Sequence, residues 1–204
     1  MVLMDDGYIK YSSHRRAGKV AETPELIALN HARTRLFDLG LVGMDGSGIG
    51  YGNVSLRSHA QQFVITASAT GASRELAMDQ YCLVESYSLE QNEVWCMGGL
   101  DASSESMSHG SMYASNEGIH CVMHIHSRFL FDRLLQLGTA TTSSTIPYGT
   151  PAMARAVAEF AKRQSSLPAL LVMAGHEEGI IACGTDVESV LALIEFTYAK
   201  ERQS

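Results

Sequence analysis

Two histidines separated by one residue carry the clearest chemical signal in the sequence. His124 and His126 lie in the run Val122 to His126, whose apolar residues predict a β-strand. Successive strand side chains alternate between the two faces, so both imidazoles project from the same side. Imidazole is a common metal ligand, and two on one face can share a cation. The spacing is compatible with a metal site, but two ordinary core or solvated histidines would give the same pattern.

A catalytic metal usually has three protein ligands and one open position, so a third ligand should lie elsewhere in the sequence. His176 is our candidate, because it follows the apolar run Leu171 to Gly175 and precedes Gly179. A loop histidine without a ligand role would look the same. His120 shares the strand face with the pair, but a separation of four strand residues spans ~13 Å, too far for one ion. The other competitors are His14, His31, His59 and His109.

A metal that polarises a substrate needs a neighbouring group to move protons, and Glu105 is the candidate. It lies in Ser103-Ser104-Glu105-Ser106, where the two serines predict the cap of a helix that runs through Met107 and Tyr113. A glutamate in a first helical turn also interacts favourably with the helix dipole, so a purely structural role stays open. His109 lies four residues on, on the same helical face, where it can orient the carboxylate.

The elements that must position these residues alternate between strand and helix. Helices are predicted at 25–39, 128–137 and 151–162, with a last helix capped by Asp186, and strands at 53–57, 62–66, 81–88, 93–97, 122–126, 169–174 and 179–183. The glycine-rich stretch 43–52 is predicted to be a flexible turn. This interleaving favours an α/β fold with a mixed sheet covered by helices.

Composition narrows the class of protein. The 204 residues suit one domain, and 46% hydrophobic with 18% charged residues is typical of a globular protein. The net charge is −7 and the basic residues are scattered, which argues against nucleic acid or an anionic membrane as a partner. Four widely spaced cysteines without a C-x-x-C pair suit reduced core residues. No apolar stretch has membrane-spanning length and no signal sequence is evident, so we expect a cytoplasmic protein.

Taken together, the motifs resemble the class II aldolase/adducin family. The resemblance rests on six segments in the family's order and covers about residues 25 to 200, which leaves 1–22 as an N-terminal extension of a single domain 1–204. The segments are Gly52 to Ser55, Ile65 to Gly71, Ser103 to Glu105, Val122 to His126, Pro147 to Pro151, and His176 with Gly179 to Gly184.

The resemblance implies a fold, a metal and a reaction. It implies a three-layer α/β/α sandwich around a mixed, mainly antiparallel sheet, commonly assembled as a homotetramer. In catalytic members, histidines at the positions of His124, His126 and His176 bind a divalent metal, usually zinc, which stabilises an enediolate after carbon–carbon cleavage. Glu105 would exchange the proton. The implied residues for binding a small substrate are Gly52, Asn53, Ser68, Gly71, Ser103 and Ser104.

Three departures from the family pattern bear on the substrate. Gly50 stands where phosphate-binding members carry Thr or Ser, and the loop Thr66 to Gly71 is longer than usual. Glu177 and Glu178 separate His176 from Gly179, and we interpret them as an extended turn, with an extra acid or ligand as the alternative. Tyr148 is either a packed turn aromatic or a proton donor. Arg128 either meets an anionic substrate or forms a surface salt bridge.

The sequence therefore predicts a metal-dependent lyase of the aldolase type that acts next to a carbonyl of a small hydroxylated substrate. A dehydratase, an epimerase or a decarboxylase would use the same metal chemistry. Epimerases of pentulose phosphates tend to have Asp at the position of Glu105, which favours aldolase or dehydratase. A non-catalytic module like the adducin head is the alternative from another class. Such modules lose the metal histidines, and this sequence retains all three.

Overall fold

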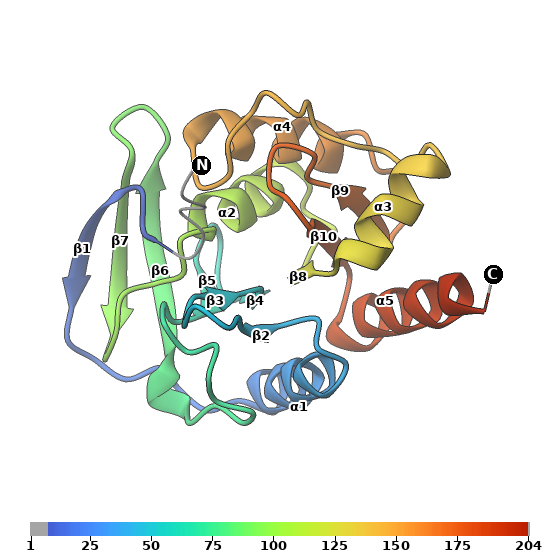
Figure 1. The fold of residues 1–204 in the computed structure, drawn as a ribbon. Helices are drawn as coiled ribbons and strands as arrows, with labels where there is room; N and C mark the ends of the chain where they lie inside the picture. Colours follow the sequence, from blue (N-terminus) through green and yellow to red (C-terminus); the bar gives the residue numbers. More distant parts are fainter. Residues whose placement is uncertain (1–7, 204) are drawn as a thin grey trace.

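The computed structural model describes residues 8–203, which form an α/β fold around one large mixed sheet (Figure 1). Its strand order is β1-β7-β6-β5-β4-β8-β10-β9, and every neighbouring pair is antiparallel except β1 and β7. The strands are β1 Ser12–Arg16, β4 Asn53–Arg57, β5 Phe63–Thr66, β6 Tyr81–Ser88, β7 Glu93–Gly98, β8 Cys121–His126, β9 Ala169–Val172 and β10 Gly179–Gly184. The prediction of a mixed, mainly antiparallel sheet is confirmed.

Helices cover both faces of the sheet and complete three layers. They are α1 Pro24–Asp38, α2 Ser106–Ser115, α3 Arg128–Gln136, α4 Pro151–Lys162 and α5 Val187–Arg202, with a 3₁₀ turn at Met78–Gln80. In Figure 1, α2 and α4 lie above the sheet while α1 and α5 lie side by side below it. Each helical layer encloses its own hydrophobic cluster against one sheet face. The predicted three-layer sandwich is therefore confirmed.

Four helices begin where their sequences predict. The side chains of Thr23, Ser127, Thr150 and Asp186 each accept a hydrogen bond from a backbone N–H in the first turn of the helix that follows. The first amides of a helix have no hydrogen-bond acceptor within the helix, and the capping side chains supply one. Proline follows the cap in α1 and α4, where its missing N–H costs nothing.

The helix after Ser103-Ser104 begins later than predicted. Glu105 occupies the N-cap position of α2 without a side-chain cap bond, and the helix starts at Ser106. The Ser106 amide instead donates to the Ser103 carbonyl oxygen at 3.0 Å, which closes a turn ahead of the helix. The predicted serine cap is therefore wrong. As a result, Ser103 and Ser104 lie in a connecting segment.

The glycine-rich stretch is more regular than the flexible turn that we predicted. It contains the short antiparallel strands β2 Gly43–Met44 and β3 Gly50–Tyr51. Between them, the Asp45 carboxylate accepts hydrogen bonds from the backbone amides of Ser47 and Ile49, which orders the turn. Alternation of apolar and polar residues is weak here, so the hairpin leaves little trace in the sequence.

The N-terminal segment contributes a strand that the sequence analysis did not predict. Within the predicted extension 1–22, residues 1–7 lie outside the described part, but β1 joins the main sheet parallel to β7. All five β1 residues are exposed, so the strand has no apolar alternation to reveal it. Tyr11 just before it is buried in the core.

Two further predictions concern the cysteines and membrane spans. All four cysteines are buried and free, as expected of reduced core residues. Across residues 8–203, none of the helices combines the length and the apolar character that crossing a membrane requires.

Candidate metal centre and active site

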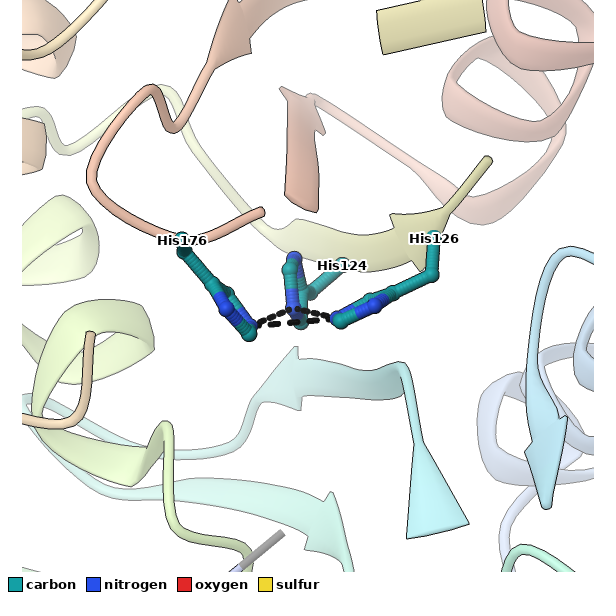
Figure 2. Close-up of side chains that lie close together, drawn as sticks. All are labelled: His124, His126 and His176. Atoms are coloured by element: carbon teal, nitrogen blue, oxygen red, sulfur yellow. Dashed lines mark hydrogen bonds between the residues drawn. The ribbon is translucent and has the colours of Figure 1, made fainter. Parts of the chain in front are cut away.

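The predicted strand with two histidines lies near the centre of the sheet, between β4 and β10. His124 pairs with Asn53 of β4 in the strand register, and His126 pairs with Gly179 of β10. Both imidazoles leave the same face of β8, as strand alternation requires. His176 approaches from the loop between β9 and β10, so all three candidate ligands meet at one point (Figure 2).

The three Nε2 atoms form a small triangle. Their separations are 3.0 Å between His124 and His126, 3.1 Å between His126 and His176, and 3.1 Å between His176 and His124. In a neutral ring, each Nε2 carries either a proton or a lone pair. With three nitrogens and two possible states, at least two of them must both be donors or both be acceptors. Those two cannot form a hydrogen bond with each other, so hydrogen bonds cannot account for all three contacts.

A bound cation could satisfy all three nitrogen atoms at once. Zinc bonds of about 2.0–2.1 Å to nitrogen in tetrahedral geometry place the ligand atoms about 3.3–3.4 Å apart, close to the separations found here. His124 Nδ1 lies 3.1 Å from the Ile180 carbonyl oxygen, so that nitrogen donates its proton and leaves a lone pair on Nε2. Within residues 8–203, these three histidines form the sole cluster that could hold a metal.

Burial keeps the imidazoles uncharged, which is the state that binds metal. His124, His126 and His176 are all buried, with exposed fractions of 8% or less. Burial lowers the pKa of His124 to about 4 and holds the pKa values of His126 and His176 well below their usual range. Neutral rings present lone pairs to a cation without first losing a proton.

Glu105 lies in the same cavity as the histidine triad and is nearly inaccessible, with 2% exposure. Its Oε1 accepts a hydrogen bond from the Gly149 amide at 3.1 Å. His109, which the sequence placed to orient this carboxylate, instead directs its Nδ1 to Ser55 Oγ at 2.7 Å. The backbone of a distant turn therefore holds the carboxylate.

One cavity of about 540 Å³ collects all the predicted site residues. Besides the triad and Glu105, its lining includes the six predicted substrate-binding residues, Gly52, Asn53, Ser68, Gly71, Ser103 and Ser104. They come from the start of β4 and the glycine before it, from the loop after β5 and from the segment before α2. Predicted residues as far apart in the chain as Gly52 and His176 therefore surround one space.

Two of these positions require glycine for close approach. A Cβ at Gly71 would lie 2.1 Å from the Gly43 carbonyl oxygen, so the loop after β5 packs directly on the β2–β3 hairpin. Gly52 has φ of +73°, and a Cβ there would lie 2.6 Å from Val42 Cγ1. Both glycines shape the cavity wall through their backbone.

Six further cavity residues carry no signal in the sequence. They are Tyr8, Ile9, Met44, Gly48, Ile49 and Tyr51, which lie in the N-terminal segment and in the β2–β3 hairpin. The two tyrosine hydroxyls apart, these residues carry no group that performs chemistry, and none of the six lies in a recognisable motif. The density of glycine between 43 and 52 was the one available signal of a close backbone approach.

The two inserted glutamates form a turn, as interpreted from the sequence. The Gly179 amide donates to the His176 carbonyl oxygen at 2.9 Å, and Glu178 has φ of +68° within this turn. Glu177 forms an ion pair with Arg128, which also bonds Asp132 at 3.0 Å. Arg128 therefore has the predicted salt-bridge role.

Comparisons with known proteins agree with this geometry. The chain matches the family described as Class II Aldolase and Adducin N-terminal domain over residues 35–199. YgbL from Klebsiella pneumoniae is similar in structure, with a TM-score of 0.65 and 19% identity over 90% of each chain. The l-fuculose-1-phosphate aldolase of Thermus thermophilus has a TM-score of 0.62 and 20% identity over 86% of this chain and 90% of that chain.

A third similar structure is the sugar-phosphate aldolase of Thermotoga maritima, with a TM-score of 0.63 and 13% identity over 87% of this chain and 93% of that chain. A search of curated proteins found no match.

The fold and the triad define an α/β/α protein whose buried histidines could bind a divalent metal. With 165 residues matched, the chain belongs to the class II aldolase and adducin N-terminal domain family. The class II aldolases of this family depend on a divalent metal.

Proposed function

We propose that this protein is a metal-dependent lyase of the class II aldolase type, with a divalent metal, most simply Zn²⁺, held by His124, His126 and His176. The observation that carries the proposal is the convergence of three buried, uncharged imidazoles in the cavity that also contains Glu105. Three nitrogen ligands and an adjacent cavity match a catalytic rather than a closed structural metal site.

The bound metal would polarise the substrate carbonyl and stabilise the enediolate that carbon–carbon cleavage produces. Glu105 would carry the proton to or from the carbon next to that carbonyl, because it is the acidic side chain of the lining. The Gly149 amide fixes the position of its carboxylate. Burial of Glu105 keeps bulk water away from the transferred proton.

The lining supports a small hydroxylated substrate, such as a sugar or a sugar acid. Ser68, Ser103, Ser104 and Asn53 present hydroxyl and amide groups that can exchange hydrogen bonds with substrate hydroxyls. A volume of about 540 Å³ suits a small molecule rather than a polymer. From the family we also propose that the single domain assembles as a homotetramer and works in the cytoplasm.

A substrate screen tests this proposal. We expect the metal-loaded protein to cleave or form a carbon–carbon bond in at least one member of a panel of aldehydes and ketoses, both phosphorylated and unphosphorylated. Activity should disappear on chelation, return with metal, and fall by about 10²-fold or more in Glu105→Gln. Product analysis distinguishes a lyase from a dehydratase, an epimerase or a decarboxylase.

Two outcomes would contradict the proposal. Full activity in Glu105→Gln would remove that residue from proton transfer. A protein that binds no metal would exclude the metal-dependent lyase and support a non-catalytic module like the adducin head.

A further inference from the structure

The turn from Pro147 to Thr150, just before α4, touches two separate parts of the proposed active site. The Tyr148 ring stacks on the His176 imidazole, with ring centroids 4.3 Å apart and planes inclined by 20°. The next residue, Gly149, donates its amide hydrogen to Glu105. One short turn therefore contacts both a candidate metal ligand and the candidate proton carrier.

This turn is fixed at its far end. Thr150 caps α4, and its hydroxyl also donates to the Pro147 carbonyl oxygen at 2.7 Å. Gly149 has φ of +65°, a conformation that glycine adopts without strain. The start of α4 therefore restrains the turn that carries Tyr148.

Lys10 contacts the same tyrosine from the N-terminal segment. Its Nζ lies 3.6 Å from the centroid of the Tyr148 ring, a cation–π contact. The Asn92 side chain donates to the Lys10 carbonyl oxygen at 2.7 Å, which anchors this part of the segment to the β6–β7 turn. Lys10 precedes the part of the chain that matches the family, which begins at residue 35.

The three candidate ligands differ in what supports them. His124 and His126 belong to β8, which is paired on both sides. His176 lies in a loop, where its own amide bonds the Met173 carbonyl oxygen at 2.7 Å. A side chain on a loop keeps more rotational freedom than one on a central strand, so the ring of His176 gains most from an external contact.

We propose that Tyr148 is a positioning residue that fixes the His176 imidazole for metal binding, and that Lys10 holds the tyrosine ring in place. This inference rests on the metal centre of the proposed function. It assigns Tyr148 to orientation of a ligand through its ring, rather than to proton donation through its hydroxyl. Groups that orient metal ligands typically change metal affinity by about 10–100-fold.

The test is a Co²⁺ titration of the full chain in competition with a chromophoric chelator. Tyr148→Phe keeps the ring and should bind Co²⁺ within about twofold of the wild-type chain. Tyr148→Leu removes the ring and should weaken binding by about 10–100-fold, with an altered visible spectrum of the bound Co²⁺. If Tyr148→Leu does not fold, Tyr148→Met, which also lacks the ring, takes its place in the same comparison.

Tyr51→Leu is the matched control. Tyr51 lines the same cavity, but its ring is tilted by 37° and its centroid lies 5.5 Å from that of His126. We expect this variant to stay within about threefold of the wild-type affinity. A loss as large as that of Tyr148→Leu would show a general effect of apolar substitution in the cavity and overturn the positioning role.

Lys10 is tested in two backgrounds. Lys10→Met should weaken Co²⁺ binding in the wild-type chain, because the tyrosine ring is then held less firmly. In the Tyr148→Leu background it should have no effect, because the ring is already absent. An equal change in both backgrounds would mean that Lys10 acts through its charge alone, which contradicts its part of the proposal.

The outcomes separate the two proposals. A wild-type chain that binds no Co²⁺ overturns both the metal centre and the positioning role. Normal Co²⁺ binding in Tyr148→Leu overturns the positioning role and leaves the metal centre intact.

Discussion

Asn53 illustrates how a single side chain is held ready for a ligand. It is buried, with 7% exposure, and lines the cavity beside His124, with which it pairs in the strand register. Its Oδ1 has no hydrogen-bond partner among residues 8–203. A buried amide oxygen without a hydrogen bond lowers the stability of the folded protein. A substrate hydroxyl that donates to Asn53 Oδ1 would remove this penalty and find an acceptor already in position.

We therefore predict that Asn53→Ala lowers kcat/KM by about 10–100-fold, which corresponds to the loss of one buried hydrogen bond of roughly 1.5–3 kcal/mol. The metal content should stay unchanged, because Asn53 is not one of the candidate ligands. Steady-state kinetics on the substrate found in the screen, with metal analysis of the same samples, provides the measurement. A kcat/KM within twofold of wild type would remove Asn53 from substrate binding.

The residues with distinctive chemistry were predictable from the sequence. The spacing of His124 and His126 requires only strand alternation, and His176 and Glu105 followed from their positions near element ends and from the family resemblance. The contact between Gly149 and Glu105 was not predictable, because it joins residues 44 positions apart through a backbone amide. A backbone donor is present at almost every residue and leaves no sequence signal.

At the scale of elements, a buried arginine of α1 holds one wall of the cavity. Arg33 is 3% exposed, and its guanidinium donates to the carbonyl oxygens of Ser73, Arg74 and Thr70, the last two at 2.8 Å and 3.3 Å. These carbonyls flank Gly71 in the loop after β5, and Gly71 packs on the β2–β3 hairpin. Arg33 thus links α1 to the cavity that contains the histidine triad without lining it.

We predict that Arg33→Met lowers the free energy of unfolding by about 3 kcal/mol, because it leaves three carbonyl groups without their charged donor. Arg35→Met is the matched control on the same helix. Arg35 is exposed and pairs with Glu195 at 2.9 Å, so its loss should cost less than about 1 kcal/mol. Chemical denaturation of both variants measures the difference, and equal costs would contradict the role of Arg33.

Most elements were predictable because their signals are local. The caps at Thr150 and Asp186 and the apolar run of β8 each depend on a few adjacent residues. The strand β1 and the hairpin of β2 with β3 were missed because their residues acquire strand geometry from distant partners. For β1 that partner is β7, about 80 residues away in the chain.

At the scale of the whole molecule, a metal held by the proposed triad would link two separate segments of the folded chain. The triad connects β8 to the loop before β10, and unfolding separates the three nitrogens. A ligand that binds only the folded state stabilises it by about 2.7 kcal/mol when present at 100 times its Kd. For a chain of this size that corresponds to a rise in Tm of about 5–10 °C.

We therefore predict that Zn²⁺ raises the Tm of the wild-type chain by about this amount and that a chelator reverses the effect. His126→Ala should abolish the metal-dependent shift. His59→Ala, which removes an exposed histidine outside the triad, should retain it. Thermal unfolding with and without Zn²⁺ measures the shift, and an identical Tm in both conditions for the wild-type chain would contradict metal binding.

Tyr8 and Ile9 form a part of the cavity wall that can vary independently of the candidate reacting groups. These residues line the cavity but precede the segment that matches the family, which begins at residue 35. The candidate ligands and Glu105 all lie inside that segment. Under the proposed function, mutations in the N-terminal segment would reshape the wall of the cavity while leaving the candidate ligands and Glu105 unchanged, so substrate preference could diverge among related proteins without a change in the reacting groups.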